Sequence, residues 1–326
     1  MRIVILIDHL GIAGAIRWAI DLSNALVSAG HEVYIGTESG KPCEWLPVTA
    51  WIYRWDKQLF NKCDVVVMMN HTKTVKGIAD KIEARVKAYW NVGMHEPTVN
   101  EVLTATDEGT VLFREVVSSG DYLVVCCSTW IWEWIKGNLN QDAKLLLPGV
   151  NHTVFHPVRG ARRPGELKLI SSGKYRENEG SKCVAAAVEI IKQKYPAAFL
   201  ETYYKKGLPQ SEMARFYASG AIWLDGQWYG GLCLAPTEAM ACGTPLVCTD
   251  IGGVKDYAVD GVNCLMVERE NPQAMADAAI RLLEDADLYK RFIVEGYKAV
   301  QRLTWARTVS NLEHYVETWI DEANDA

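Results

Sequence analysis

The chain has 326 residues, of which 49% are hydrophobic and 23% are charged, and its formal net charge is −6. This length predicts two domains of ordinary size, and the apolar content is sufficient for two cores. No run of Lys or Arg stands out, which argues against a large nucleic-acid-binding surface but leaves room for a local basic cleft.

Nine cysteines are present, most of them in apolar runs such as Cys126–Cys127, and no two have the C-x-x-C spacing. We therefore expect reduced thiols rather than a zinc or redox site. The N-terminal apolar run, Ile3–Ile7, is too short for a signal peptide or a membrane span. These features predict a cytoplasmic protein, with peripheral contact at the inner face of a membrane left open.

The first half of the chain alternates strand and helix patterns. Ile3–Ile7 predicts a buried parallel strand, Gly11 and Gly14 follow it, and apolar residues at helical spacing then run to Gly30. Further strands are expected at 31–35, 64–69, 88–92, 122–127 and 145–147, with a helix over 128–139. The order strand, glycine loop, helix, strand is typical of a parallel α/β sheet.

Residues 148–166 are rich in Pro, Gly and Arg and have no period, so they predict a linker. Strands are then expected at 167–171, near Phe199, near Ile222 and at 246–248, and helices over 181–195, from near Pro236, over 272–284 and through the last forty residues. We predict domains at 1–155 and 156–305, and a helix over 306–326 that packs back on the first domain. Ligands of such open sheets bind at the carboxyl ends of the strands.

The most specific segment is EAMACGTPLVCTDIGGVKDYAVDG, which begins at Glu238. Pro236 stands where a helix is expected to start, and the unsatisfied amides of a helix start suit a phosphate. We expect Glu238 in the same first turn, where its carboxylate could accept hydrogen bonds from ribose hydroxyls. Gly252–Gly253 would let the backbone approach a ligand closely. From these residues alone, a helix-start acid followed by ordinary turn glycines explains the pattern equally well.

The same segment resembles the donor-binding signature of the retaining glycosyltransferase family 4, through Glu238–Ala241, Gly243–Pro245 and Gly252–Gly253. The stretches 14–35, 146–157 and 216–224 resemble the first helix and second strand, the interdomain segment, and the helix and strand before the donor loop of that family. The resemblance implies the GT-B fold, in which two Rossmann-like, doubly wound parallel-sheet α/β domains face each other across a cleft. The first would bind the acceptor and the second the nucleotide-sugar donor.

The resemblance also implies a site. His95, Lys174 and Glu238 would be the catalytic residues, with Glu238 on the ribose and His95 beside the sugar. Donor-binding residues would be Gly14, Lys174, Arg176, Lys182, Gly230, Gly231, Leu234, Ala235, Pro236, Thr237 and Glu238. His9 and His71, which also follow strands, are alternatives to His95.

The implied reaction needs no cofactor and no metal. The donor would be a nucleoside-diphosphate sugar, with UDP or GDP as the nucleotide. Lysine and arginine charges and helix amides would stabilise the leaving diphosphate, and attack on the same face would retain the anomeric configuration. The acceptor hydroxyl would belong to a glycan, a lipid-linked glycan or a small molecule. A modified nucleic-acid base is a less favoured acceptor.

The sequence departs from the family pattern around the donor. The family pairs two glutamates eight residues apart, and Gly230 stands where the first is expected. Glu179 stands where a lysine is expected, so that Arg176 or Lys182 would have to supply its charge. The first loop has Ala13–Gly14 in place of two glycines, and the stretch from 173 to 226 is short by about one strand–helix unit.

Two other interpretations stay open. One is another sugar-nucleotide enzyme on the same fold, such as an epimerase, and the other is a non-catalytic nucleotide-sugar-binding protein. Tryptophans at 130, 132 and 134 fit either packing or stacking on a sugar or base, and their exposure together with Lys136 would indicate a membrane surface.

Overall fold

The computed structural model describes residues 1–55, 60, 62–69, 72–91, 108–174, 180–204 and 208–325. The chain forms two compact units, which are Met1–Gly149 together with Trp305–Ala326, and Val150–Thr304. The chain thus leaves the first unit after Gly149 and returns to it at Trp305. The sequence pattern predicted these two boundaries after 155 and after 305.

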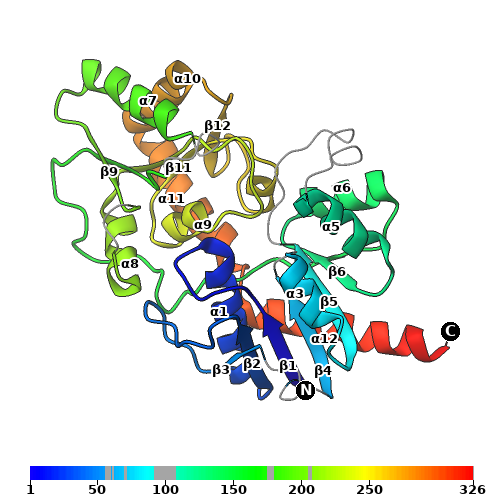
Figure 1. Cartoon of the computed structure of the whole chain (residues 1–326). Helices are drawn as coiled ribbons and strands as arrows, with labels where there is room; N and C mark the ends of the chain where they lie inside the picture. Colours follow the sequence, from blue (N-terminus) through cyan, green and yellow to red (C-terminus); the bar gives the residue numbers. More distant parts are fainter. Residues whose placement is uncertain are drawn as a thin grey trace. The chain divides into compact units, whose positions relative to one another are not determined.

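The first unit is built on a parallel sheet with the strand order β3-β2-β1-β4-β5-β6-β7 (Figure 1). The strands are β1 (Arg2–Leu6), β2 (Glu32–Thr37), β3 (Trp51–Arg54), β4 (Cys63–Met68), β5 (Ala84–Asn91), β6 (Leu123–Cys126) and β7 (Lys144–Leu145). In the central strand β1, Ile3 is in register with Val33 on one side and Val65 on the other. The inner strands β1, β4 and β6 contain continuous aliphatic runs, as expected where helices cover both faces of a parallel sheet.

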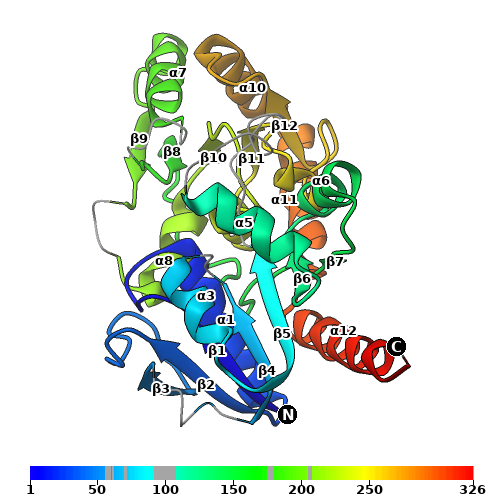
Figure 2. The same ribbon diagram turned by 45° about the vertical axis from the view of Figure 1, so that its right-hand side comes forward.

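The helices of the first unit are α1 (Gly14–Ser28), α3 (Lys73–Ala79), α5 (Glu108–Ser118), α6 (Thr129–Leu139) and α12 (Trp305–Asp325). The last of these, α12, packs beside α1 (Figure 2). The buried residues Val309, Leu312 and Val316 form its apolar stripe. The Tyr315 hydroxyl donates to the carbonyl of Leu145 at 3.0 Å, so α12 is part of the first unit.

The second unit contains a parallel sheet with the order β12-β11-β10-β8-β9. Its strands are β8 (Lys168–Ser171), β9 (Phe199–Thr202), β10 (Ile222–Asp225), β11 (Leu246–Thr249) and β12 (Cys264–Val267). Its helices are α7 (Ser181–Lys194), α8 (Gln210–Ser219), α9 (Leu234–Ala241), α10 (Pro272–Glu284) and α11 (Ala286–Gln301), with a 3₁₀ turn at Gly253–Asp256. In Figures 1 and 2, α7 and α10 lie side by side, and their buried residues, such as Val188 of α7 and Ala279 of α10, belong to one hydrophobic core.

The structure corrects the expected linker at 148–166. Phe155 is fully buried, and its ring lies edge-on to Tyr217 with 5.9 Å between centroids. The guanidinium of Arg162 donates to the carbonyl of Gly220 and to the hydroxyl of Tyr289. Residues 150–166 are therefore folded onto the second unit, and their lack of a hydrophobic period reflects irregular backbone rather than a free linker.

The sequence pattern missed strands β3 and β12 and helices α3 and α5, and it predicted strand β5 too short. The edge strand β3 keeps Trp51 54% exposed and Tyr53 39% exposed, so it lacks the buried run of an inner strand. Strand β5 begins at Ala84, four residues earlier than expected, because the polar Arg85 and Lys87 mask its start. Strand β12 is only four residues long.

Asp21, on the buried face of α1, carries a carboxyl group inside the first unit. Burial raises its pKa to about 6, against the lowering effect of Arg17, whose Nε lies 3.6 Å from the Asp21 carboxylate. The protonated form therefore suits the folded protein better than the ionised form does. Because the unfolded pKa is lower, this contribution to stability is fully present below about pH 4 and is lost as the pH rises through about 6.

We predict that Asp21→Asn removes this pH dependence. The stability of the variant relative to the wild type should rise by about 2 kcal/mol between pH 4 and pH 8, because only the wild type must ionise a buried acid. Urea unfolding of both proteins across this range measures the difference, and other carboxyl groups cancel in the comparison. A difference that stays constant across the range would contradict the pKa assigned to Asp21.

Candidate functional site

The second sheet contains a point at which the strand order reverses. From β8 the chain proceeds to β9 on one side, and later places β10 on the other, with Ile222 in register with Leu169. The helices that follow these two central strands are α7 and α9. Ligands of open α/β sheets bind in the crevice beyond the carboxyl ends of such neighbouring strands. Topology alone therefore directs attention to the loops after β8 and β10.

Pairs of glycines bring these loops into backbone contact. A Cβ atom on Gly180 would lie 1.7 Å from the carbonyl oxygen of Gly226, and one on Gly253 would lie 1.7 Å from that of Gly231. Neither distance is possible for a residue with a side chain, because the obstructing atoms belong to the backbone. Glycine at 180 and 253 is thus what allows the loops after β8, β10 and β11 to meet.

Two further contacts fix the loop after β10. Gly230 pairs with Gly252 in an isolated parallel bridge, and the Thr249 hydroxyl donates to the carbonyl of Gln227. At the start of the loop, the Asp225 carboxylate accepts hydrogen bonds from the backbone N–H of Gln227 at 3.1 Å and from the indole of Trp223 at 3.2 Å. The loop that leads into α9 is therefore held along its length.

Neither helix at the reversal point is capped by the side chain of its N-cap residue. Gly180 precedes α7 and has no side chain, and Cys233 precedes α9 without bonding to its first turn. By contrast, Asn271 and Asp285 cap α10 and α11 with their side chains. The first-turn amides of α7 and α9 carry partial positive charge, which makes both helix starts suited to an anion.

The structure corrects the expected position of Glu238. Helix α9 begins at Leu234, so Pro236 is its third residue and Glu238 its fifth, beyond the first turn. A helical side chain leans back toward the N-terminus, and a carboxylate in the second turn is thereby directed toward the helix start. Glu238 is only 2% exposed. The pKa of the neighbouring Cys242 thiol is raised mainly by the burial of the thiol and further by the negative charge of Glu238.

The other donor-binding residues predicted near α9 lie together at its start. Gly230 and Gly231 belong to the loop after β10, while Leu234 and Ala235 are half-buried in the first turn. The N–H groups of these last two residues are available because the helix has no earlier carbonyls to accept them. Pro236 has no N–H, and the Thr237 hydroxyl donates to the carbonyl of Leu234 at 2.7 Å, so Thr237 closes the turn.

Lys174 and Lys182 flank the start of α7. Lys174 is half-buried, and its carbonyl accepts a hydrogen bond from the hydroxyl of Ser181, the first residue of α7. Gly173 before it has a φ of +71°, and a Cβ there would lie 2.4 Å from the Thr202 Cβ of β9. These two contacts hold Lys174 at the carboxyl end of β8. Lys182 is exposed on the first turn of α7.

Several predicted residues fall outside the described part of the chain. These are His95, which lies in 92–107, His71, which lies in 70–71, and Arg176 and Glu179, which lie in 175–179. The predictions made for them therefore stand as they were. Sequence reasoning did not single out Gly180, Gly226, Asp225, Gln227 and Cys233. Of these, Asp225–Gly226, directly after a buried strand, was a signal for a loop at the sheet edge.

In the first unit, Gly14 is the first residue of α1. It is exposed, a Cβ atom there would meet nothing within 4 Å, and Ala13 before it cannot cap the helix with a side chain. The start of α1, after the inner strand β1, is thus another helix N-terminus without a side-chain cap, as are the starts of α6 and α8. His9 is exposed in the preceding loop, where its Nδ1 accepts the N–H of Gly11 at 3.0 Å.

Among the described residues, no group of three or more His, Cys, Asp or Glu side chains is arranged to hold a metal ion. The pair Asp285 and Asp287 has the Asp-x-Asp spacing, but Asp285 accepts the N–H groups of Asp287 and Leu288 as the cap of α11. This spacing therefore has a structural explanation. In the same described part of the chain, no helix is long and apolar enough to cross a membrane.

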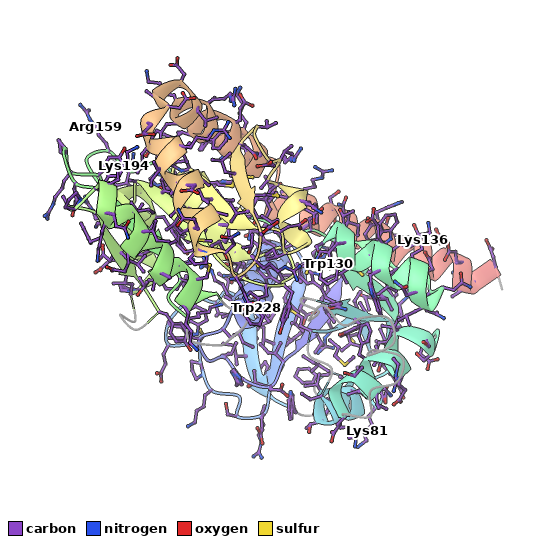
Figure 3. All side chains as sticks on the ribbon, turned by 90° about the horizontal axis from the view of Figure 1, so that it is seen from above. Lys81, Trp130, Lys136, Arg159, Lys194 and Trp228 are labelled. Atoms are coloured by element: carbon purple, nitrogen blue, oxygen red, sulfur yellow. The ribbon has the colours of Figure 1, made fainter. Side chains whose placement is uncertain are left out.

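The tryptophans of α6 are half-buried rather than exposed (Figure 3). The indole N–H of Trp132 donates to the carbonyl of Ala143 at 2.8 Å, and the Lys136 ammonium lies 5.3 Å from the centroid of its ring. Trp132 thus fixes the connection from α6 to β7. These contacts favour the packing interpretation of the segment and supply no argument for a membrane surface.

Residues 201–299 match the family described as glycosyl transferases group 1. An uncharacterized glycosyltransferase of Methanocaldococcus jannaschii is 22% identical over 68% of this chain and 66% of its own length. The D-inositol 3-phosphate glycosyltransferase of Corynebacterium urealyticum is 30% identical over 41% of this chain and 30% of its own length. Over residues 201–299, the chain is thus similar to the group 1 glycosyltransferases.

Solved structures of other proteins share the fold over nearly the whole chain. A sucrose-phosphate synthase from Thermosynechococcus elongatus is 17% identical and superposes with a TM-score of 0.79 over 99% of this chain and all of its own. HepE from Anabaena, solved with UDP-glucose, is 14% identical with a TM-score of 0.72 over 98% of this chain and all of its own. The expected GT-B fold is thereby confirmed.

We predict that Gly253→Ala destabilises the second unit by about 2 kcal/mol or more, because its methyl group would collide with the Gly231 carbonyl. Gly77→Ala, on α3, is the matched control. Its methyl group would meet nothing within 4 Å, so it should be neutral or stabilise by up to about 1 kcal/mol. Thermal unfolding of both variants tests this. Equal stability of the two would mean that the loops do not meet at these glycines.

Proposed function

We propose that the chain is a retaining glycosyltransferase that moves a sugar from a nucleoside-diphosphate sugar to a hydroxyl acceptor. The second unit would bind the donor, with UDP or GDP as the nucleotide. Support for a nucleotide-sugar donor comes from HepE, which has been solved with UDP-glucose and with UDP, and from a pneumococcal O-GlcNAc transferase solved with UDP and GlcNAc.

The observation that carries the proposal is the open start of α9 beside a reversal of strand order. The amides of Leu234 and Ala235 would bind the diphosphate, and Glu238, leaning back from the second turn, would accept hydrogen bonds from the ribose hydroxyls. The partly positive first-turn amides and the negative Glu238 carboxylate then lie on one short helix. Such a pairing fits a ligand that carries an anion and a diol a few bonds apart.

No resident metal is part of the proposed mechanism. The leaving diphosphate gains charge as the glycosidic bond breaks, and preorganised donors are the means by which a protein stabilises such charge. Lys174 at the end of β8 and Lys182 on α7 would supply cations, together with the amides of two uncapped helices. Departure and attack on the same face of the sugar would retain the anomeric configuration without a protein nucleophile.

The acceptor is the least constrained part of the proposal. Several relatives are D-inositol 3-phosphate glycosyltransferases, and another is a phosphatidyl-myo-inositol mannosyltransferase, so a small phosphorylated polyol or a lipid-linked acceptor is a reasonable first choice for assays. The matched lengths cover only 50%, 30% and 22% of those proteins. In the first unit, Gly14 and His95 are the residues that we propose to act on the donor and the sugar.

The first test is the effect of Glu238→Ala and Glu238→Gln on nucleotide affinity. We expect each to weaken UDP or GDP binding by roughly 1.5–3 kcal/mol, because both remove a charged acceptor of hydroxyl hydrogen bonds. Calorimetry with UDP, GDP, UDP-glucose and GDP-mannose measures these affinities and shows whether the site prefers uridine or guanosine nucleotides. Glu238→Gln keeps the shape of the buried side chain, so it separates lost binding from lost folding.

Glu189→Ala is the control for these variants. Glu189 lies on α7, where its side chain is 70% exposed and pairs with Lys192, so nucleotide affinity should not change. If the wild type binds nucleotide and Glu238→Gln binds it equally well, then Glu238 does not hold the ribose. Nucleotide binding without any transfer or hydrolysis of the donor would instead favour a non-catalytic binding protein, which the glycine at 230 also suggests.

A second prediction uses the cysteines as reporters. Of the nine thiols, only Cys43 and Cys233 are not buried, and Cys233 lies at the start of α9. An alkylating reagent should therefore modify these two in the folded protein. Saturating UDP or GDP should slow the modification of Cys233 and leave that of Cys43 unchanged. Mass spectrometry reads both rates in one sample, and equal slowing or no slowing would argue against a nucleotide at α9.

A further inference from the structure

Gln227 lies in the loop after β10, at the reversal point, and its backbone is hydrogen-bonded on both sides. Its backbone N–H donates to Asp225 at 3.1 Å, and its carbonyl accepts the hydroxyl of Thr249. Asp225 is itself 5% exposed and accepts the indole N–H of Trp223. The backbone of Gln227 is therefore fixed by the ends of two neighbouring strands, β10 and β11.

The side chain of Gln227 is oriented by Cys233. The thiol of Cys233 donates to Oε1 of Gln227 at 3.1 Å, across the turn that leads into α9. Cys233 has a φ of +63°, a backbone conformation that favours glycine. A Cβ atom on Gly230 would lie 2.7 Å from the Cys233 sulfur. The thiol thus occupies space that exists because residue 230 has no side chain.

This arrangement determines which chemistry Gln227 can offer. Because Oε1 accepts the thiol, the polar group of Gln227 left for a ligand is the Nε2 amide. This group can donate two hydrogen bonds and accepts none. The next residue, Trp228, has a buried indole N–H without a hydrogen-bond partner among the described residues (Figure 3). An indole also donates only. Both consecutive side chains therefore suit a ligand rich in oxygen lone pairs, and an anionic oxygen is the strongest such acceptor.

We propose that Gln227, held in orientation by Cys233, donates a hydrogen bond from Nε2 to a diphosphate oxygen of the donor nucleotide. The inference rests on the proposed function, since it places the same diphosphate at the start of α9. A carboxylate on this loop would repel that anion and accept hydroxyl hydrogens, whereas the amide of Gln227 adds a donor. Gln227 is thus a specificity-determining residue that reads phosphate oxygens rather than the base.

The test compares Gln227→Glu and Gln227→Ala for binding of UDP and uridine, with GDP and guanosine as a second pair. Gln227→Glu keeps the size of the side chain, removes the donor and adds a negative charge, so UDP or GDP affinity should fall about tenfold or more. Gln227→Ala should lower it by a smaller factor. Binding of the nucleoside should stay unchanged in both variants, because it has no phosphate.

Gln273→Ala, on α10, is the matched control, since the Gln273 amide bonds to Asp277 one turn away at 2.9 Å. Cys233→Ala should reduce diphosphate affinity in the same direction as Gln227→Ala, and Cys233→Ser, which keeps a donor for Oε1, should restore most of it. This pattern of loss and rescue reports on orientation, which a purely structural role of the thiol would not produce.

The outcomes separate the two proposals. A wild type that binds neither UDP nor GDP overturns the proposed function itself. A wild type that binds the diphosphate while Gln227→Glu binds it equally tightly overturns only the role of Gln227. Equal losses for UDP and uridine would place Gln227 on the base and also overturn the inference. Circular dichroism and thermal unfolding of each variant establish that the second unit is folded before affinities are compared.

Discussion

The candidate site depends on backbone segments that approach more closely than any side chain permits. Gly180 against Gly226, and Gly253 against Gly231, join the loops that follow three parallel strands. Hydrophobic burial in the second unit fixes where these strands end, but it does not by itself bring their loops together. The glycine contacts do so, and they leave the starts of α7 and α9 facing the same strand ends without side-chain caps.

The charged groups and helix amides around these loops favour the binding of an anion. Lys174 and Lys182 stand near one helix start. Near the other, Gly230 stands where the family pattern has a glutamate, and the Cys233 thiol lies in the space that a side chain at 230 would need. The negative charge of the nearby Asp250 is paired with the Lys255 ammonium, which lies 2.7 Å from the carboxylate. Burial would raise the pKa of Asp250, but Lys255 and the Gly252 amide bring it below its usual value. Glu238 is the buried carboxylate of α9, and it is the one that we propose to bind the ribose hydroxyls.

The sequence predicted most of the fold because buried parallel strands are continuous aliphatic runs, and helices such as Pro272–Glu284 have clear start and stop signals. It failed where polar residues mask an edge, as in β3, and where local rules competed, as at Pro236. That proline suggested a helix start, yet the helix begins two residues earlier at Leu234. The proposed roles of Gln227 and Cys233 could not be predicted. They depend on a contact between the Gln227 side-chain amide and the thiol of Cys233, a residue whose backbone has a positive φ. No periodicity encodes such a contact.

The return of the chain to its first unit at Trp305 has a consequence for biosynthesis. Residues 150–304 form a self-contained unit, whereas the first unit lacks α12 until Trp305–Asp325 have been made. Until then, the surface of α1 that α12 covers, and the carbonyl of Leu145 that Tyr315 bonds, have no partner from that helix. On the ribosome, the unit that is translated first should therefore be completed last, after residues 150–304 and α12 have been made.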